Sequence, residues 1–236
     1  MNPPLVLIPG LMADARLFLP QMVALGARHA MQIFLPTEGD FVETYSQAVL
    51  DSAPASFVLI GHGLGGAVAL DVLRRAPERV QRIVLMATDP LSEPPNTAVA
   101  RETRIVAARA GRLVQAIREE FPADSFADTE WRDDVLNVVQ DMALGLGEGV
   151  FIRQSRALQR RPDQQKTMRR TKVQALILAG EHDLIVPLRR QEFTAGLMPY
   201  GNFQVIAGAG HLPSLEQPDA VTDAITAFLN APLLLR

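Results

Sequence analysis

The chain contains no cysteine and one tryptophan, and aromatic residues make up only 6% of its 236 residues. Without cysteine, neither disulfide bonds nor thiolate metal sites can form. So few aromatic residues disfavour a sugar site lined with aromatic rings. No apolar run reaches the roughly 20 residues of a membrane-spanning helix, and the first residues lack the basic and apolar segments of a secretion signal. We therefore expect a cytoplasmic protein with no membrane partner.

The sequence also lacks a strong excess of either charge. Its formal net charge of -3 gives no reason to expect nucleic acid or an anionic membrane as a partner. Hydrophobic residues make up 48% of the chain, which is typical of a globular protein. The length is sufficient for one sizeable α/β domain with a well-buried core.

Six short apolar runs predict six buried strands. Each run is continuous rather than alternating, which is typical of a parallel sheet that is covered on both faces. Helical patterns at 16–25, 41–52, 64–75 and 218–229 alternate with the runs, and this alternation predicts a doubly wound α/β fold. The runs are 5–8, 31–35, 57–60, 83–86, 175–178 and 203–206.

One long interval of the chain contains no convincing strand. Residues 89–171 hold helical patterns instead, and we interpret them as an inserted helical lid or cap. The core domain would then consist of residues 1–88 and 172–236.

A glycine-rich turn directly follows the third apolar run. The segment Gly61-His62-Gly63-Leu64-Gly65-Gly66 suits a tight strand-to-helix turn, because small residues let the strand and the helix approach closely. The N–H groups at the start of such a helix point at whatever lies above the turn. A phosphate loop would need a G-K-[ST] sequence, which is absent, and a glycine-rich turn alone is a weak signal for a dinucleotide site.

Two further motifs follow predicted strands. Asp183 lies in "LILAGEHDLIVP" and His211 lies in "GAGHLPSLEQP". Taken alone, Asp183 suits a helix cap and His211 suits a surface loop. However, the carboxyl ends of parallel strands form the rim where active sites lie. The order of glycine-rich turn, aspartate and histidine is also the order of nucleophile, acid and base in one large family of hydrolases.

On these motifs the chain resembles the α/β-hydrolase superfamily, in its small single-domain carboxylesterase branch. "LIPGLMADARLF" is similar to the family's oxyanion-loop segment, and "GHGLGG" to its nucleophile elbow, which usually reads G-H-S-x-G-G. The chain departs from the pattern at Pro9-Gly10, where His-Gly is commoner, and at Gly63, which replaces the serine. The resemblance implies the α/β-hydrolase fold, with a mostly parallel, doubly wound sheet of about six strands. It also implies hydrolysis of a small ester or lactone without a cofactor or metal.

The resemblance implies a role for each matching residue. Asp183 would orient the imidazole of His211 and stabilise its charged form. His211 would act as general base and then as general acid. The N–H groups of Leu11 and Leu64 would form the oxyanion hole. Position 63 would carry the attacking oxygen, which Gly63 lacks.

Five other polar residues lie in or near these motifs. We expect His62 to be a packed structural residue of the elbow, and His29 and His182 to lie at the surface. Asp89, at the end of the fourth predicted strand, is the alternative acid, because some hydrolases place their carboxylate there. We expect Glu216 to anchor the final helix rather than react.

Three explanations of Gly63 are open. A serine could have been removed deliberately, which would give an inactive protein that keeps its substrate bound. The chain could be a natural non-catalytic binding protein. It could also be an enzyme that uses only His211 and Asp183, such as a lyase or a cofactor-free oxygenase. The first explanation is favoured, because a fold that had abandoned catalysis would have less reason to keep both residues in intact motifs.

The lid sequence does not identify the substrate. Leu113, Ile117 and Phe121 fall on one helical face, and we expect them to pack on the core rather than face a pocket. Arginines such as Arg104, Arg109 and Arg112 are expected on a solvated helix face, with docking of an acidic carrier protein as the alternative.

Overall fold

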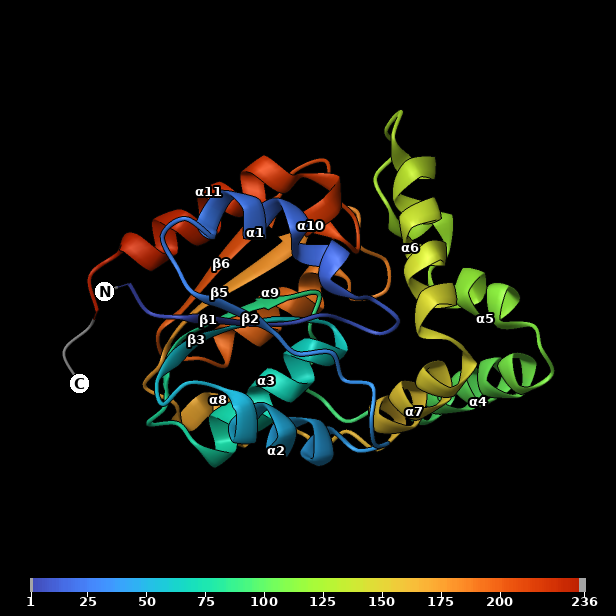
Figure 1. Ribbon diagram of the computed structural model, residues 1–236, viewed down its shortest axis with the longest axis horizontal. Helices are drawn as coiled ribbons and strands as arrows, with labels where there is room; N and C mark the ends of the chain where they lie inside the picture. Colours follow the sequence, from blue (N-terminus) through green and yellow to red (C-terminus); the bar gives the residue numbers. More distant parts are fainter. Residues whose placement is uncertain (1, 234–236) are drawn as a thin grey trace.

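A six-stranded, wholly parallel sheet forms the centre of the structure, a computed structural model that describes residues 2–233 (Figure 1). The strand order is β2-β1-β3-β4-β5-β6, so the chain crosses back over β1 before it continues in the other direction. This crossover makes the sheet doubly wound, and it confirms the predicted fold class. The strands are β1 (Leu5–Ile8), β2 (Met31–Ile33), β3 (Phe57–His62), β4 (Val80–Met86), β5 (Gln174–Gly180) and β6 (Gly201–Ile206).

All six predicted runs form strands, although several ends differ from the prediction. Strands β1 and β3 are buried along their whole length, as continuous apolar runs require. The two edge strands, β2 and β6, are partly exposed. Strand β3 continues past its apolar run through Gly61 and His62, because backbone pairing with β4 continues there.

Helices cover both faces of the sheet (Figure 1). One face carries α1 (Leu19–Leu25), α10 (Pro213–Glu216) and α11 (Pro218–Asn230), and the other carries α2 (Val42–Ser52) and α3 (Leu64–Arg75). Helix α9 (Leu188–Gly196) packs on β5 and β6. The predicted helix at 16–25 is wrong in one respect. It is divided into a 3-10 helix, Ala15–Phe18, and α1, which has Pro20 in its first turn.

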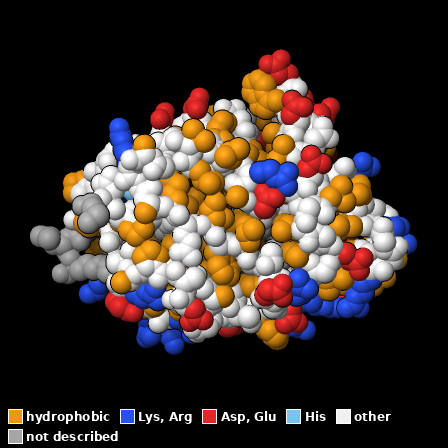
Figure 2. All heavy atoms as spheres, in the orientation of Figure 1, with side chains coloured by type: hydrophobic (Ala, Val, Ile, Leu, Met, Phe, Trp, Pro, Cys, Tyr) orange, Lys and Arg blue, Asp and Glu red, His pale blue; other side chains and the backbone are white. Residues whose placement is uncertain are grey.

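The interval between β4 and β5 is helical throughout its regular structure, as predicted. Four of its helices stand beside the carboxyl ends of the strands (Figure 1). Helix α8 (Gln165–Arg170) instead packs against α3 of the core. In Figure 2, acidic side chains gather around the upper end of α6, whose first turn contains Asp133 and Asp134. The four lid helices are α4 (Pro95–Arg109), α5 (Leu113–Glu120), α6 (Arg132–Leu146) and α7 (Glu148–Gln159).

Within residues 2–233, no single helix is both long and apolar enough to cross a membrane. Helices α6 and α7 would reach that length and composition only together, and they are bent by 101° relative to each other.

The crossover in the sheet brings two loops together. Strands β1 and β3 are neighbours, and Ile8 is paired with Gly61. The loop that follows β1 and the turn that follows β3 therefore leave the same edge of the sheet side by side. Open α/β sheets bind their ligands at such a switch point.

Candidate active site

The turn between β3 and α3 consists of a single residue, Gly63, with φ 51° and ψ -113°. This conformation strains any residue that has a Cβ atom. A Cβ atom built on Gly63 would nevertheless find space, because its nearest neighbours, Ala87 O and Gly10 Cα, would lie 3.9 Å away. At Gly65 a Cβ atom would lie 1.9 Å from Ile8 O. Glycine is therefore required for packing at position 65, whereas position 63 has space for a larger side chain.

The structure brings Asp183 and His211 together. His211 Nδ1 lies 3.1 Å from both Oδ1 and Oδ2 of Asp183, and both residues are buried. Asp183 Oδ1 also accepts the N–H groups of Ile185 and Val186, at 2.9 and 3.0 Å. Since Nδ1 faces the carboxylate, Nε2 is the ring nitrogen of His211 that remains for a reacting atom.

The two groups perturb each other's pKa. Burial disfavours the charged form of His211, but the charge of Asp183 and its hydrogen bond outweigh burial and raise the pKa of the imidazole. Burial likewise opposes the charge on Asp183, but the charge and hydrogen bond of His211 lower the pKa of that carboxyl. The pair therefore favours a charged imidazole beside a charged carboxylate, as a general base needs after it has taken a proton.

His62 lies beneath this pair as a packed residue. Burial lowers the pKa of His62 to about 3, so its ring is neutral at ordinary pH. His62 Nε2 donates to the backbone oxygen of His211 at 2.8 Å, and the two rings pack edge to face. A Cβ atom on Gly10 would lie 2.6 Å from His62 Nδ1. The ring therefore connects the elbow, the His211 loop and the loop after β1.

The residues predicted for the oxyanion hole lie at the same switch point. Leu11 and Leu64 both line the cavity that Gly63 and His211 line. Among residues 2–233, the N–H groups of Leu11 and Leu64 have no hydrogen-bond acceptor. Leu64 is the first residue of α3, so its N–H carries the positive end of the helix dipole. Both N–H groups are free to donate to a ligand oxygen.

Two buried glutamines support the site, and neither was predicted from the sequence. Gln154, on α7, accepts the N–H of Met12 at 2.7 Å and donates to Pro36 O at 2.9 Å. Met12 has φ 53° in a turn closed by a bond from Ala13 N to Gly10 O. Gln191, the second glutamine, donates to Asp183 Oδ2 at 3.3 Å and accepts the N–H of a strained alanine, residue 87, at 3.1 Å. A single glutamine in a helix has no motif that would reveal such a role.

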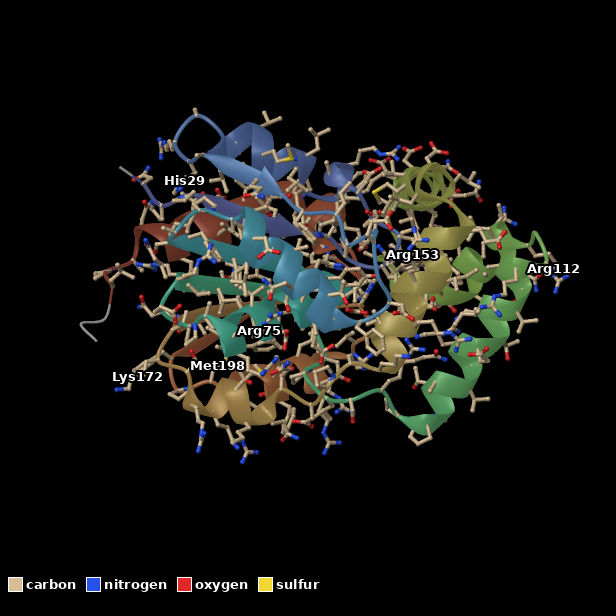
Figure 3. The ribbon with its side chains drawn as sticks, turned by 60° about the horizontal axis from the view of Figure 1, so that its bottom comes forward. His29, Arg75, Arg112, Arg153, Lys172 and Met198 are labelled. Carbon is tan, nitrogen blue, oxygen red and sulfur yellow. The ribbon has the colours of Figure 1, made fainter. Side chains whose placement is uncertain are left out.

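Three expectations about individual residues are wrong. His29 is buried, and its Nδ1 lies 2.8 Å from Pro3 O (Figure 3). Glu216 does not anchor the final helix. Its carboxylate accepts the N–H groups of residues 127, 210 and 212, each at 2.8 Å, and so fixes the loop around His211. Phe121 lines the cavity, and its ring packs on that of His211 at 5.9 Å between centroids.

Asp89, the alternative acid, lines the cavity, and its Oδ1 accepts the N–H of Leu91 at 3.0 Å. The carboxylate in contact with His211 is that of Asp183. His182 is exposed, as expected. Arg112 is exposed too, at the outer end of the lid (Figure 3). The same expectation is wrong for Arg104, whose side chain is only 15% exposed because it is paired with Glu120.

A cavity of about 260 Å³ opens above Gly63 and His211. Most of its lining residues are apolar, and they come from the loop after β1, from α3, from lid helices α6 and α7, and from the loops after β5 and β6. One wall is charged, and it comes from α4 and the segment before it, from the end of α5, and from the segment after α7. Among the described residues, no group of three or more His, Asp or Glu side chains could hold a metal ion.

The chain is similar to known hydrolases over nearly its whole length. The model for the "Alpha/beta hydrolase family" matches residues 5–224. A pimeloyl-acyl-carrier protein methyl ester esterase of Xanthomonas axonopodis pv. citri is 26% identical, over 97% of this chain and 95% of its own. Its counterpart in Aromatoleum aromaticum is 25% identical, over 78% of each chain.

Solved structures show the same fold. An esterase from Thermogutta terrifontis has a TM-score of 0.87 at 23% identity, over 97% of this chain and 90% of its own. An enol-lactonase from Burkholderia xenovorans has a TM-score of 0.86 at 21% identity, over 98% and 93%. At these identities, the two likenesses confirm the expected fold.

Proposed function

The chain belongs to the α/β-hydrolase family, and from this premise we propose that it is an ester hydrolase whose nucleophile position holds glycine. Gly63 would stand where a serine attacks the substrate, with Asp183 and His211 as acid and base. The observation that carries the proposal is the buried contact of Asp183 with His211 beside a strained turn that has space for a side chain. Esterases and an enol-lactonase among the similar proteins support a small ester or lactone as substrate.

The chemistry follows from the positions of the groups when serine occupies position 63. The serine oxygen would attack the carbonyl carbon, and His211 Nε2 would take its proton. The N–H groups of Leu11 and Leu64 would bind the oxygen that becomes negative. His211 would then protonate the leaving alcohol, and water would release the acid by the same steps. With Gly63 the first bond cannot form, so we propose that this chain binds the ester without cleaving it.

Replacing Gly63 tests the proposal directly. Gly63→Ser should hydrolyse short-chain aryl esters at least about 10³-fold faster than the Gly63 protein, judging from the losses when triad members are removed. A phosphonate probe should label residue 63 of this variant. Gly63→Ala is the matched control, because it adds the same Cβ atom without the oxygen and should stay inactive. If the serine variant shows neither ester turnover nor labelling, the proposed function is wrong.

A second candidate is a proton-transfer enzyme that uses only Asp183 and His211. The intact contact between these residues favours it, because the base is complete without residue 63. Such an enzyme would act with Gly63 in place, as a lyase or a cofactor-free oxygenase. Its activity must disappear in His211→Ala and must follow the titration of one imidazole. A broad screen that finds no turnover dependent on His211 in the Gly63 protein would eliminate this candidate.

A further inference from the structure

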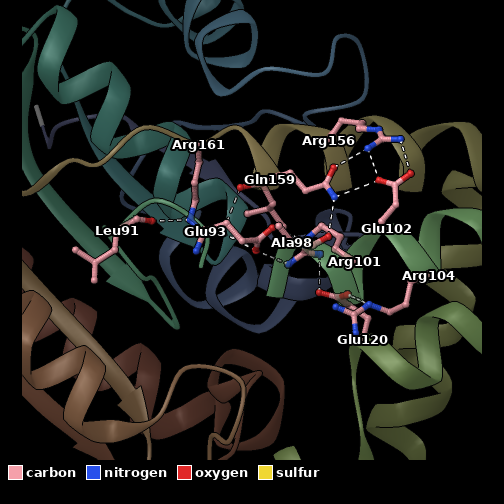
Figure 4. Close-up of polar contacts among 11 residues, drawn as sticks. Leu91, Glu93, Ala98, Arg101, Glu102, Arg104, Glu120, Arg156, Gln159 and Arg161 are labelled. Carbon is pink, nitrogen blue, oxygen red and sulfur yellow. Dashed lines mark hydrogen bonds and ion pairs between the residues drawn. The ribbon is translucent and has the colours of Figure 1, made fainter. Parts of the chain in front are cut away.

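One wall of the cavity is built from buried charges (Figure 4). Arg101 lies between two carboxylates, with Nε 2.9 Å from Glu93 Oε2 and Nη1 2.9 Å from Glu120 Oε1. Arg161 Nη1 lies 3.0 Å from Glu93 Oε1. The side chains of these four residues are between 1% and 10% exposed. We call Glu93, Arg101, Glu120 and Arg161 the charged wall.

Stability alone does not account for the charged wall. Apolar side chains of similar volume usually stabilise a fold as well as a buried ion pair or better, because charges lose their hydration on burial. The rest of the cavity is lined mainly by apolar side chains, among them Val139, Met142 and Leu158. Buried charges beside the apolar part of a pocket are typical of groups that orient a polar part of a ligand.

The charged wall and its outer partner carry one excess positive charge. Arg104 contacts Glu120 Oε2 from the outer side, with its Nε 2.7 Å away. Three guanidinium groups therefore face two carboxylates. The neighbouring ion pairs are balanced and leave this excess unchanged; they are Asp89–Arg190 and Glu102–Arg156.

The hydrogen-bonding capacity that the wall offers to a ligand is that of a donor. Glu120 Oε2 accepts no hydrogen bond, but it is buried and lies 2.7 Å from Arg104 Nε, so it is closed to a ligand. All three guanidinium nitrogens of Arg101 donate to carboxylates. Both oxygens of Glu93 already accept from guanidinium groups. Arg161 donates through Nε to Leu91 O at 2.8 Å and through Nη1 to Glu93. Its Nη2 has no partner among residues 2–233, although the side chain is nine-tenths buried in the cavity lining. A ligand group at this wall must therefore be an acceptor.

We propose that the cavity takes an ester whose acid half ends in a free carboxylate, and that Arg161 binds that carboxylate through Nη2. The proposal deepens the proposed esterase function and rests on it for the ester group. One negative charge matches the excess of one positive charge, whereas a phosphate dianion would place a second negative charge beside Glu93. The chain between the two ends is short, because Phe121, the neighbour of Glu120, packs on His211.

Binding to the Gly63 protein tests the proposal without requiring turnover. We would titrate the protein with monomethyl esters of straight-chain dicarboxylic acids, from succinate to suberate, and with the neutral dimethyl esters. At least one monoester should bind about tenfold to a hundredfold more tightly than its diester, as expected for a charged hydrogen bond in a buried site. Arg161→Gln should remove this preference and leave diester binding unchanged. Arg156→Gln, which lies on α7 five residues before Arg161 and outside the cavity lining, is the matched control and should keep the preference.

Two results would overturn the proposal. One is equal affinity for monoester and diester across the whole series, which needs no variant and so does not depend on the folding of Arg161→Gln. The other is an equal loss of affinity for monoester and diester in Arg161→Gln, provided that this variant unfolds at the same temperature as the parent. The test is separable from that of the esterase function. A preference for monoesters, together with an inactive Gly63→Ser, would support the carboxylate site and contradict hydrolysis.

Discussion

Serine at position 63 should destabilise the fold slightly while it creates the nucleophile. The backbone of Gly63, at φ 51° and ψ -113°, lies in a region that costs a residue with a Cβ atom about 1–3 kcal/mol. The new Cβ atom would meet no neighbour closer than 3.9 Å, so it causes no clash. Glycine loses more chain entropy on folding, which offsets at most about 1 kcal/mol. The net loss in the free energy of unfolding should be about 1 kcal/mol.

Thermal and urea unfolding of the two proteins without ligand would measure this difference. About 1 kcal/mol corresponds to roughly 2–4 °C in melting temperature for a domain of this size. The slope of the free energy against urea concentration should not change, because the same surface is exposed on unfolding. Gly63→Ala should lose as much as Gly63→Ser, since both add the same Cβ atom. A serine variant that is clearly more stable than the Gly63 protein would refute the claim that position 63 is strained.

Four further predictions concern the surroundings of that position. In Gly63→Ser, kcat/KM should rise with pH to a plateau, with a midpoint above about pH 6.5. The reason is that His211 must be neutral to take a proton, and its pKa is raised. A midpoint below about pH 6.5 in the pH-rate profile would contradict this. The same shift should stabilise the fold below about pH 6.5, and this contribution should be lost as the pH rises through the folded pKa, as urea unfolding at several pH values would show. Gln154→Leu should lower the free energy of unfolding, measured with urea, by about 1–3 kcal/mol, because it leaves the buried N–H of Met12 unpaired. Combined with Gly63→Ser, it should lower kcat more than it changes KM. An unchanged kcat would show that Gln154 does not position the oxyanion loop. Gly65→Ala should abolish folding or lower the melting temperature by many degrees, because its Cβ would lie 1.9 Å from a backbone oxygen of β1; a melting curve like that of the parent would contradict the close approach of α3 to the sheet.

Local patterns in the sequence were enough to locate most of the fold. Continuous apolar runs identified all six strands, because burial on both faces leaves a signal that needs no knowledge of neighbours. The motifs around Asp183 and His211 indicated two residues that the structure brings within 3.1 Å of each other. Both signals are short and contiguous, so they can be found in the sequence alone.

Contacts across long sequence separations could not be predicted in the same way. Gln154 reaches Met12 across 142 positions, and Glu216 reaches Ala127 across 89. Neither glutamine nor glutamate has a pattern that distinguishes a buried amide or carboxylate from an exposed one. The side of α5 that Phe121 faces also depends on how the lid lies over the sheet. These interactions are decided by packing between the lid and the core, which periodicity within one helix does not describe.

Gly63 is inconsistent with the residues that surround it. The close approach of Gly65 to β1, the free N–H groups of Leu11 and Leu64, and the contact of Asp183 with His211 all suit a reacting oxygen above the turn. A sequence usually specifies one structure because local and global requirements agree, and departures concentrate at functional sites. Here the strained turn is kept but presents no side chain. Since glycine adopts that conformation with little steric penalty, replacing serine there would remove the nucleophile without disturbing the rest of the site, which is why a substrate could still bind.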